Sequence, residues 1–458
     1  MDASAHFRGK KITVIGLGLL GRGVGDAQYL AECGVELIVT DLKTREQLAE
    51  SIKQLESFSS IRFVLGEHRL EDFRSCDMVL KAAGVPLDSI YIAEAKKNNI
   101  QVRMSADLFA EVSGIPCIGV TGTRGKSTTA HMLHAILKEV GRKVLLGGNV
   151  RGVSTLALLK EATSEHVAVL ELDSWQLQGW GEARMSPHIA VFTTLYSDHL
   201  NYYGSIPSTM LGTGSLTTSK DGMDAYLADK ANIFLNQKEG DVLVLGKQCA
   251  PTIIEKYGDK IRADIVVADE FKFPDTWTLR IPGMHNRYDA ALALVAVRAY
   301  GIPDNASRRA LESFAGVPGR LELVAEKGGV KMYNDTTATT PEATMAAIEA
   351  LRQTSGQNQD LILILGGADK RLDMEALIAK LHELKHVILL AGTGTDRIKG
   401  RLPDATTYGS IAEAVADAFA HATSGDAILL SPAFASFGMF KNEYDRGDQF
   451  NAIVQSYE

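Results

Sequence analysis

The sequence predicts an α/β protein of three domains, each built on a mostly parallel sheet. At 458 residues, the chain has the length of roughly three domains of about 150 residues. Short β-branched runs alternate with helical patterns along its whole length, which is typical of βαβ units. Two glycine-rich turns, each expected between a strand and a helix, indicate phosphate sites of the kind that parallel sheets carry.

The expected strands fall into three groups, and the joints lie where glycine and proline cluster, near residues 108–116 and 316–319. The groups are 11–15, 37–40, 78–81 and 101–103; then 117–121, 144–146, 167–172, 189–193 and 241–245; then 330–333, 361–365, 387–391 and 427–431. We therefore expect three α/β domains, at residues 1–108, 109–318 and 319–458, of which the first and the last are Rossmann-like. Residues 206–222 are small, polar and unpatterned, which predicts a surface loop.

Composition excludes several classes of protein. The chain has 48 basic and 56 acidic residues, a net charge of -8, which argues against a nucleic-acid or anionic-membrane binder. Its apolar runs are too short to cross a bilayer, so we expect a cytoplasmic protein. We also expect it to be a monomer. Cys33, Cys76, Cys117 and Cys249 lack CxxC spacing, so the cysteines indicate neither a disulfide framework nor a zinc site.

The strongest chemical signal is the segment at residues 119–128, GVTGTRGKST, between an expected buried strand and an expected helix. A phosphate needs unobstructed backbone N–H groups at a helix start, a lysine for the terminal phosphates and a hydroxyl for magnesium. Gly122, Gly125, Lys126 and Ser127 supply these groups, although their spacing is one residue off the usual GxxxxGK[ST] pattern. The alternative is a glycine-rich turn without a ligand.

A second glycine-rich segment, GLGLLG at residues 16–21, follows the first expected strand and opens a helix. Asp41 ends the next strand, so the context is that of a dinucleotide-binding turn. The pattern cradles a diphosphate and does not distinguish NAD from a UDP-sugar. A purely structural turn is the alternative.

Acidic and imidazole groups follow two strands of the central group. Glu171 ends the strand at 167–172, and Asp198 and His199 follow the strand at 189–193. Such residues are commonly helix caps or turn residues. Beside a phosphate loop they also suit Mg²⁺, which takes hard oxygen ligands, and a second cation that accepts an imidazole.

A set of motifs, in order over nearly the whole chain, resembles a known family. The motifs are residues 119–128, 171–177, 198–199, 283–286, 319–322, 334–339, 366–370 and 431–437. The sequence looks like a Mur ligase, and within that family it most resembles the enzymes that add D-glutamate to UDP-N-acetylmuramoyl-L-alanine. The resemblance implies a UDP-sugar-binding domain at residues 1–108, a central P-loop-type ATPase domain at 109–318 and an amino-acid-binding domain at 319–458. It also implies that ATP phosphorylates the substrate carboxylate and that the incoming amine then attacks the acyl phosphate.

The resemblance also assigns roles to residues of this chain. Lys126, His199 and Lys230 would be catalytic, with Lys230 carbamylated; the alternative for Lys230 is a solvated helix lysine. Two Mg²⁺ ions would be held by Ser127, Glu171, His199 and Lys230. ATP would be bound by Gly122, Thr123, Arg124, Gly125, Lys126, Ser127, Thr128, Asn286, Arg320 and Asp335, with Asp335 at the ribose or the domain joint. The UDP-linked substrate would be bound by Gly18, Leu19, Leu20, Asp41, Gly84 and Asn149, and glutamate by Thr339, Lys370 and Ser436.

Other functions stay open at this point. The same ligation with L-glutamate or another amino acid, or a folate-type polyglutamate ligase, would use similar ATP chemistry. An NAD-dependent dehydrogenase would explain residues 16–21 and Asp41 but would leave the phosphate loop unused. An inactive nucleotide-binding regulator would explain the motifs without turnover.

Overall fold

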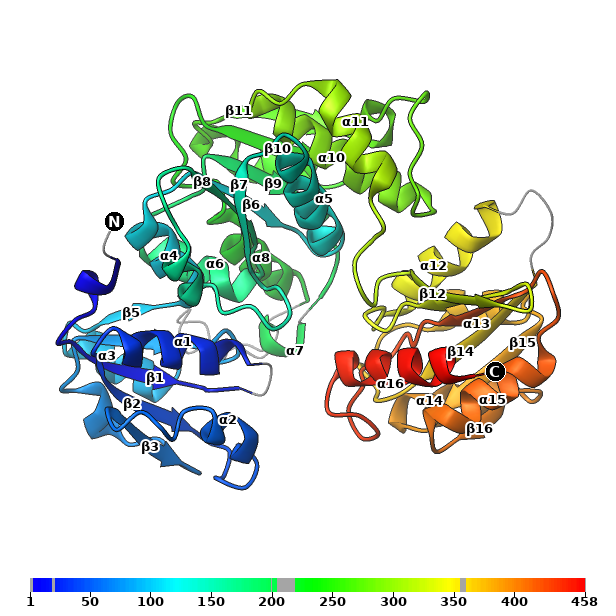
Figure 1. The fold of residues 1–458 in the computed structure, drawn as a ribbon, viewed down its shortest axis with the longest axis horizontal. Helices are drawn as coiled ribbons and strands as arrows, with labels where there is room; N and C mark the ends of the chain where they lie inside the picture. Colours follow the sequence, from blue (N-terminus) through cyan, green and yellow to red (C-terminus); the bar gives the residue numbers. More distant parts are fainter. Residues whose placement is uncertain (1–2, 19–20, 199, 204–218, 355–359, 458) are drawn as a thin grey trace. The chain divides into compact units, whose positions relative to one another are not determined.

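The computed structural model describes residues 3–18, 21–198, 200–203, 219–354 and 360–457 (Figure 1). Leu19, Leu20 and His199 lie outside these ranges, as do residues 206–218 of the expected loop. The chain forms two compact units, the first comprising residues 1–275 and 289–311, and the second residues 276–288 and 312–458. The first unit holds two sheets and the second unit holds one. The expected boundaries of three domains stay a prediction.

The first sheet is parallel throughout, in the order β3-β2-β1-β4-β5. The chain builds outward from β1 in one direction and then in the other, so the strand order reverses between β1 and β4, where open α/β sheets bind ligands. The strands are β1 (Lys11–Ile15), β2 (Glu36–Asp41), β3 (Ile61–Leu65), β4 (Met78–Lys81) and β5 (Gln101–Arg103). The helices are α1 (Arg22–Glu32), α2 (Ala49–Lys53), α3 (Ile90–Lys97) and α4 (Ser105–Ser113).

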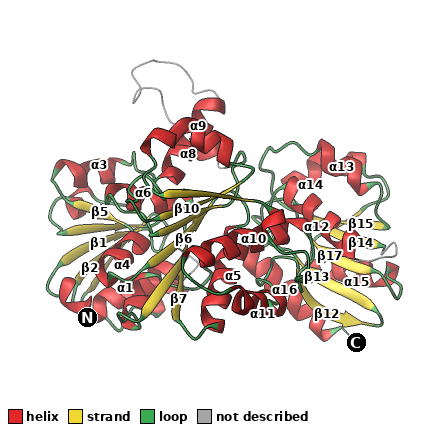
Figure 2. Cartoon of the chain, turned by 90° about the horizontal axis from the view of Figure 1, so that it is seen from above, coloured by secondary structure: helices red, strands yellow, loops and turns green. Residues whose placement is uncertain are grey.

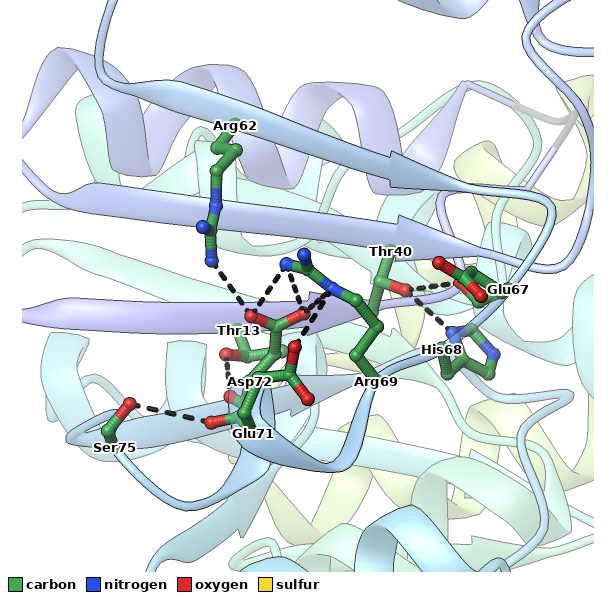
Figure 3. Close-up of polar contacts among 9 residues, drawn as sticks. All are labelled: Thr13, Thr40, Arg62, Glu67, His68, Arg69, Glu71, Asp72 and Ser75. Atoms are coloured by element: carbon green, nitrogen blue, oxygen red, sulfur yellow. Dashed lines mark hydrogen bonds and ion pairs between the residues drawn. The ribbon is translucent and has the colours of Figure 1, made fainter.

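The reversal makes the chain cross from β3 at one edge of the sheet to β4 on the far side of β1. Thr40 on β2 and Thr13 on β1 hold this crossing, since their hydroxyls donate to the carbonyls of Glu67 and Asp72 at 3.0 and 2.6 Å. The buried Asp72 carboxylate pairs with two arginines, at 2.8 Å from Arg62 and 2.8 Å from Arg69 (Figure 3). These contacts fix where β4 begins, and therefore where its carboxyl end lies.

The second sheet is also parallel, in the order β11-β10-β9-β6-β8-β7. Its strands are β6 (Cys117–Thr121), β7 (Lys143–Gly148), β8 (His166–Glu171), β9 (Ile189–Phe192), β10 (Val242–Gly246) and β11 (Asp264–Ala268). Its helices are α5 (Lys126–Glu139), α6 (Ser174–Glu182), α7 (Leu200–Tyr203), α8 (Ser219–Ala231), α9 (Ala250–Tyr257), α10 (Met284–Ala299) and α11 (Asp304–Ser313). One continuous core includes Val14 of β1 and Leu170 of β8, which joins the first two sheets in one unit.

The third sheet has the order β12-β13-β17-β14-β15-β16, parallel except that β12 runs antiparallel to β13. Its strands are β12 (Glu322–Lys327), β13 (Val330–Asn334), β14 (Leu361–Gly366), β15 (His386–Leu390), β16 (Thr406–Tyr408) and β17 (Ala427–Leu430). Helices cover both faces (Figure 2), with α12 (Pro341–Thr354), α13 (Glu375–Leu381) and α14 (Thr393–Ile398) on one core and α15 (Ile411–His421) and α16 (Glu443–Ser456) on the other.

The three sheets confirm the predicted α/β class. Every strand expected from the sequence is present, with ends shifted by no more than about a residue or two. Within the described ranges, the strands that the sequence did not predict are β3, β11, β12 and β16, and each lies at the edge of its sheet. The loop predicted at 206–222 is wrong for its last residues, because α8 already begins at Ser219. No helix in the described part of the chain combines the length and apolarity that a bilayer span requires.

Candidate active site

The phosphate loop connects β6, which is buried along its whole length, to α5, which begins at Lys126 as predicted. Gly122 and Gly125 have positive φ angles of 139° and 83°. A Cβ added at Gly122 would lie 2.0 Å from Thr193 Oγ1, and one at Gly125 would lie 2.3 Å from Asp289 Oδ1. Both positions therefore require glycine.

The end of β9 fixes the shape of this loop. The Thr123 N–H donates to the Thr194 carbonyl at 2.7 Å, and the Arg124 N–H donates to Thr194 Oγ1 at 3.0 Å. The Thr193 hydroxyl donates to the Arg124 carbonyl from the other side. Strands β6 and β9 are neighbours in the sheet, so the loop rests on the strand end beside it.

The start of α5 suits a phosphate. Among the described residues no side chain caps this helix, which is entered through the left-handed Gly125, whereas Asp173 caps α6 by accepting from the Gln176 N–H at 2.7 Å. Helix α1 is entered in the same way, through the left-handed Gly21. An uncapped helix start presents N–H groups and a positive dipole end to an anion. Both predicted phosphate turns have this feature.

Two lysines reach the same loop carbonyl. Lys126 Nζ donates to the carbonyls of Gly122 and Thr123 at 3.0 and 3.1 Å, and Lys230 Nζ donates to the Gly122 carbonyl at 2.9 Å. Lys230 also donates to Thr121 Oγ1 at 3.3 Å. One amine from the loop and one from α8 therefore meet at the Gly122 carbonyl of the predicted phosphate loop.

Lys230 is buried, with an exposed fraction of 1%, so the alternative of a solvated helix lysine does not describe it. Burial, and then the charge of Lys126, lower the pKa of Lys230 well below its usual value. The carboxylates of Asp173, Asp198 and Asp229 oppose this shift. A buried amine with a lowered pKa is more often uncharged, which is the form that reacts as a nucleophile.

Glu171 ends β8, as predicted, and is almost completely buried. It pairs across the sheet with Val120, so its backbone leaves the same sheet edge as the phosphate loop. Its carboxylate accepts from Asn149 Nδ2 at 3.4 Å, and Asn149 Oδ1 accepts from the Arg22 guanidinium of α1. This chain of contacts connects the first turn of α1 to the end of β8. Ser127 and Thr128 are buried in the first turn of α5.

A cavity of about 220 Å³ lies at the point where the strand order of the first sheet reverses. Gly18 after β1 and Gly84 after β4, both predicted to bind substrate, line it. Gly148 of β7 and Gln176 of α6 line it too. The cavity therefore lies between the first and second sheets, beside Asn149.

Asp41 does not line this cavity, although the sequence suggested a ligand contact there. Its Oδ2 accepts from the N–H groups of Leu17 and Gly18 at 2.9 and 3.3 Å, and its Oδ1 accepts from the Lys43 N–H at 2.9 Å. The carboxylate therefore holds the glycine turn from behind. A direct contact with substrate stays a prediction.

The three residues predicted to bind glutamate follow neighbouring strands of the third sheet. Lys370 Nζ donates to Thr339 Oγ1 at 3.0 Å, so the structure brings these two side chains together. The loop before Lys370 pairs with the loop that holds Ser436, through the Ala368 N–H and the Ala435 carbonyl at 2.8 Å. All three loops follow the carboxyl ends of neighbouring parallel strands.

The remaining residues predicted to bind ATP, Asn286, Arg320 and Asp335, belong to the second unit. Asn286 Nδ2 donates to the Pro282 carbonyl at 2.6 Å. The Asp335 carboxylate accepts from the Leu321 N–H at 3.1 Å and from Ser431 Oγ at 2.8 Å, and burial raises its pKa to about 7. Asp335 therefore links the residue before β12 to the residue after β17, and its predicted contact with ATP stays a prediction.

Two buried cations were missed by the sequence analysis. Lys81 ends the otherwise apolar β4, lines the cavity and donates to the Val85 carbonyl at 2.7 Å, and burial lowers its pKa to about 8. A lysine at the carboxyl end of an otherwise apolar strand could have indicated a binding-site residue. Arg446 of α16 is fully buried and donates to the Thr336 carbonyl at 2.8 Å. Arg446 lies among polar residues of its helix, so the sequence did not indicate that its side chain is buried.

Comparison with known proteins agrees with this geometry. The chain matches the "Mur ligase MurD-like, N-terminal domain" at residues 10–104, the "Mur ligase middle domain" at 120–297 and the "Mur ligase, glutamate ligase domain" at 319–434. It is 35% identical to the UDP-N-acetylmuramoylalanine--D-glutamate ligase of Roseiflexus sp. (strain RS-1), over 98% of this chain and 99% of that one. The chain belongs to the Mur ligase family. The predicted resemblance is therefore confirmed.

Other Mur ligases are similar to this chain in sequence or fold. The enzyme of the same name from Borreliella burgdorferi (strain ATCC 35210) is 33% identical, over 97% of each chain. Crystal structures of UDP-N-acetylmuramate-alanine ligase MurC from Thermotoga maritima and of MurF from Acinetobacter baumannii match with TM-scores of 0.62 and 0.60. They cover 98% and 99% of this chain, and 100% and 92% of their own, at 17% and 16% identity, so they support the Mur ligase fold. Membership in this family confirms the predicted enzyme class, an ATP-dependent amide ligase.

Proposed function

We propose that this Mur ligase adds D-glutamate to UDP-N-acetylmuramoyl-L-alanine with ATP, as a cytoplasmic step of peptidoglycan precursor synthesis. The observation that carries the proposal is the similarity, over nearly the full length of the chain, to ligases named for that reaction. The phosphate loop and the cavity between the first two sheets support the proposal, because they offer separate sites for a nucleotide and a diphosphate-linked substrate.

In the proposed reaction, a carboxylate oxygen of UDP-N-acetylmuramoyl-L-alanine attacks the γ-phosphorus of ATP and the bond to ADP breaks. The amine of glutamate then attacks the acyl carbon, phosphate leaves, and the amine loses a proton. Lys126 would neutralise the transferred phosphoryl group, which is the main task in such transfers. Gly122, Thr123, Arg124, Gly125, Ser127 and Thr128 would bind the phosphates, and Asn286, Arg320 and Asp335 the rest of ATP.

The carboxylate at the end of β8 and the hydroxyl of the phosphate loop are suitable ligands for magnesium. Glu171 and Ser127 offer hard oxygen ligands at the sheet edge that carries the phosphate loop. A carbamate on Lys230 would add an anionic oxygen, and His199 a ring nitrogen, for a second ion. Bound magnesium would supply charge neutralisation at the phosphates. The lowered pKa of Lys230 supports carbamylation, since only the neutral amine adds to CO₂.

We place the UDP-linked substrate in the cavity of the first unit. Gly18, Leu19, Leu20 and Gly84 would bind the diphosphate and uridine, with Asp41 behind the turn and Asn149 toward the muramoyl group. Glutamate would bind to Thr339, Lys370 and Ser436. One cation with hydroxyl and backbone donors suits an acyclic dicarboxylate, whereas a dibasic amino acid would bring a like charge to Lys370.

A phosphate-release assay with a panel of amino acids tests the reaction and the substrate together. With UDP-N-acetylmuramoyl-L-alanine and ATP, we expect release to require an amino acid and to be fastest with D-glutamate. Faster turnover with L-glutamate would contradict the assignment of the D enantiomer, and preference for lysine or diaminopimelate would contradict the assignment of an acidic amino acid. Absence of release with every amino acid would favour a regulator, and nicotinamide binding in a fluorescence titration would favour a dehydrogenase.

A further inference from the structure

A group of metal-ligating side chains lies away from the proposed active site, on the third sheet. It consists of His386, Asp417 and His421, and their ligand atoms all lie within 4.8 Å of one another. Among the described residues, no other group of three or more histidine, cysteine or carboxylate side chains brings its ligand atoms so close together. His386 and Asp417 are mostly buried, with side-chain exposures of 17% and 14%, and His421 is half-exposed at 49%.

The secondary structure explains why these residues meet. His386 is the first residue of β15, while Asp417 and His421 are four residues apart on α15 and so lie on the same helix face. Helix α15 packs on this sheet through the core that also contains Ile388 of β15. The cluster lies at the amino end of β15, whereas the loop of Lys370 leaves the carboxyl end of the neighbouring β14. The two sites therefore lie at opposite ends of the parallel strands.

The geometry is close to what a metal needs. His386 Nε2 lies 3.2 Å from Asp417 Oδ2, and His421 Nδ1 lies 3.0 Å from Asp417 Oδ1. Ligand atoms bound about 2 Å from a tetrahedral zinc ion lie roughly 3 to 3.5 Å apart. The two imidazole rings are stacked, with centroids 3.9 Å apart and planes 21° apart. His421 Nδ1 also lies 3.0 Å from the Asp417 backbone carbonyl, so this nitrogen would exchange that contact for the metal.

We propose that His386, Asp417 and His421 form a binding site for a divalent transition metal of the zinc class. Two imidazole nitrogens and one carboxylate oxygen suit Zn²⁺, Ni²⁺ or Cu²⁺ better than Mg²⁺, which prefers an all-oxygen shell. Three protein ligands leave a position for water or an added ligand. The ion would join the amino end of β15 to the last turn of α15, so it would stabilise the second unit without touching the reacting groups.

A neighbouring tyrosine contacts the carboxylate of this cluster. The Tyr408 hydroxyl forms a hydrogen bond with the Asp417 side chain. Such outer contacts orient ligating carboxylates in metal sites. The competing explanation is that Asp417 only accepts hydrogen bonds from the two histidines, in which case removing one histidine would leave metal binding unchanged.

Zinc binding by the full chain, prepared without a histidine tag, tests the proposal. Zn²⁺ affinity is measured by competition with a chromophoric chelator at pH 8, with excess Mg²⁺ and ADP to occupy the proposed active site. We expect one zinc ion per chain in the wild type, and at least a tenfold weaker affinity in both His421→Ala and Asp417→Asn. The control His382→Ala, an exposed histidine of the same unit, should bind as the wild type does.

Spectroscopy and activity make the test independent of folding. Co²⁺ should give a visible absorption band in the wild type and in His382→Ala that is absent from His421→Ala. His421→Ala replaces a half-exposed side chain, so we expect it to fold and to retain wild-type phosphate release. Unchanged zinc affinity in both His421→Ala and Asp417→Asn would overturn the proposal.

Discussion

The lysine at position 230 gives the sharpest test of the active site, because fold and activity should respond differently to its loss. In Lys230→Met, a side chain of similar volume replaces the buried amine and two hydrogen bonds are lost. The Gly122 carbonyl keeps its bond from Lys126, and Thr121 Oγ1 still donates to the Leu172 carbonyl at 2.7 Å. At about 1 kcal/mol for each bond, we expect the free energy of unfolding to fall by no more than about 2 kcal/mol.

Activity should fall much further in the same variant. If a carbamate on Lys230 holds a metal ion, we expect phosphate release to drop more than about 100-fold, or roughly 2.7 kcal/mol of barrier. Lys230→Ala should be equally inactive and about 2 to 4 kcal/mol less stable, since it leaves a cavity. Acetate should partly restore activity to Lys230→Ala but not to Lys230→Met, whose side chain fills the space.

The matched control is Lys256→Ala, which removes an exposed lysine whose ion pair with Asp224 is 2.7 Å long. It should retain wild-type stability and turnover. Urea unfolding and phosphate release on the same preparations provide both readouts. Full activity in Lys230→Ala would refute the assignment of this lysine and make Lys220 the next candidate.

Three further predictions follow from the described contacts. Lys126→Ala should abolish turnover while unfolding in urea nearly as the wild type does, because its side chain donates to two loop carbonyls, of which that of Gly122 keeps its bond from Lys230; more than about a tenth of wild-type kcat would count against it. Lys370→Ala should raise the KM for glutamate roughly tenfold or more and leave that for ATP nearly unchanged, in a steady-state assay that varies each substrate. Burial raises the pKa of Asp26 to about 6 from 3.8, so its native state holds a proton that the unfolded chain releases between these pH values. Wild-type stability should therefore fall by up to about 3 kcal/mol as the pH rises from 3 to 7, with about 2 kcal/mol of this between pH 4 and 6, and Asp26→Asn should remove this part of the slope in urea unfolding at each pH.

The fold could be predicted where strands are buried on both faces. Central strands such as β6, β14 and β17 are continuous apolar runs, because helices cover them on both sides. The missed strands lie at sheet edges and carry polar or exposed residues, as in β11, where four of five residues are exposed. An edge strand depends on its partner rather than on its own pattern, and the sequence alone does not show the partner.

The active site was predictable where local geometry dictates residue type. Gly122 and Gly125 are required by backbone angle and by neighbouring atoms, and such positions are visible as glycines in a sequence. Asp41 shows the limit of a pattern, since its position after β2 was recognised, yet its carboxylate holds the N–H groups of the glycine turn. A pattern identifies which residues gather at a strand end, and only coordinates show which of them face the ligand.

Lys230 and Arg446 show how little a helix pattern says about a buried basic side chain, since Lys230 was assigned only through the family resemblance and Arg446 was missed. Each lies on a helix with several polar neighbours, so the usual expectation is a solvated side chain. Arg446 instead reaches the Thr336 carbonyl and Thr336 Oγ1 from within the protein, and burial lowers its pKa to about 10. Burying a cation costs free energy that carbonyl and hydroxyl acceptors only partly return. Both basic side chains hold loops that carry proposed site residues, Lys230 the phosphate loop and Arg446 the segment before Thr339, so the cost of burying them is incurred where loop position matters most for function.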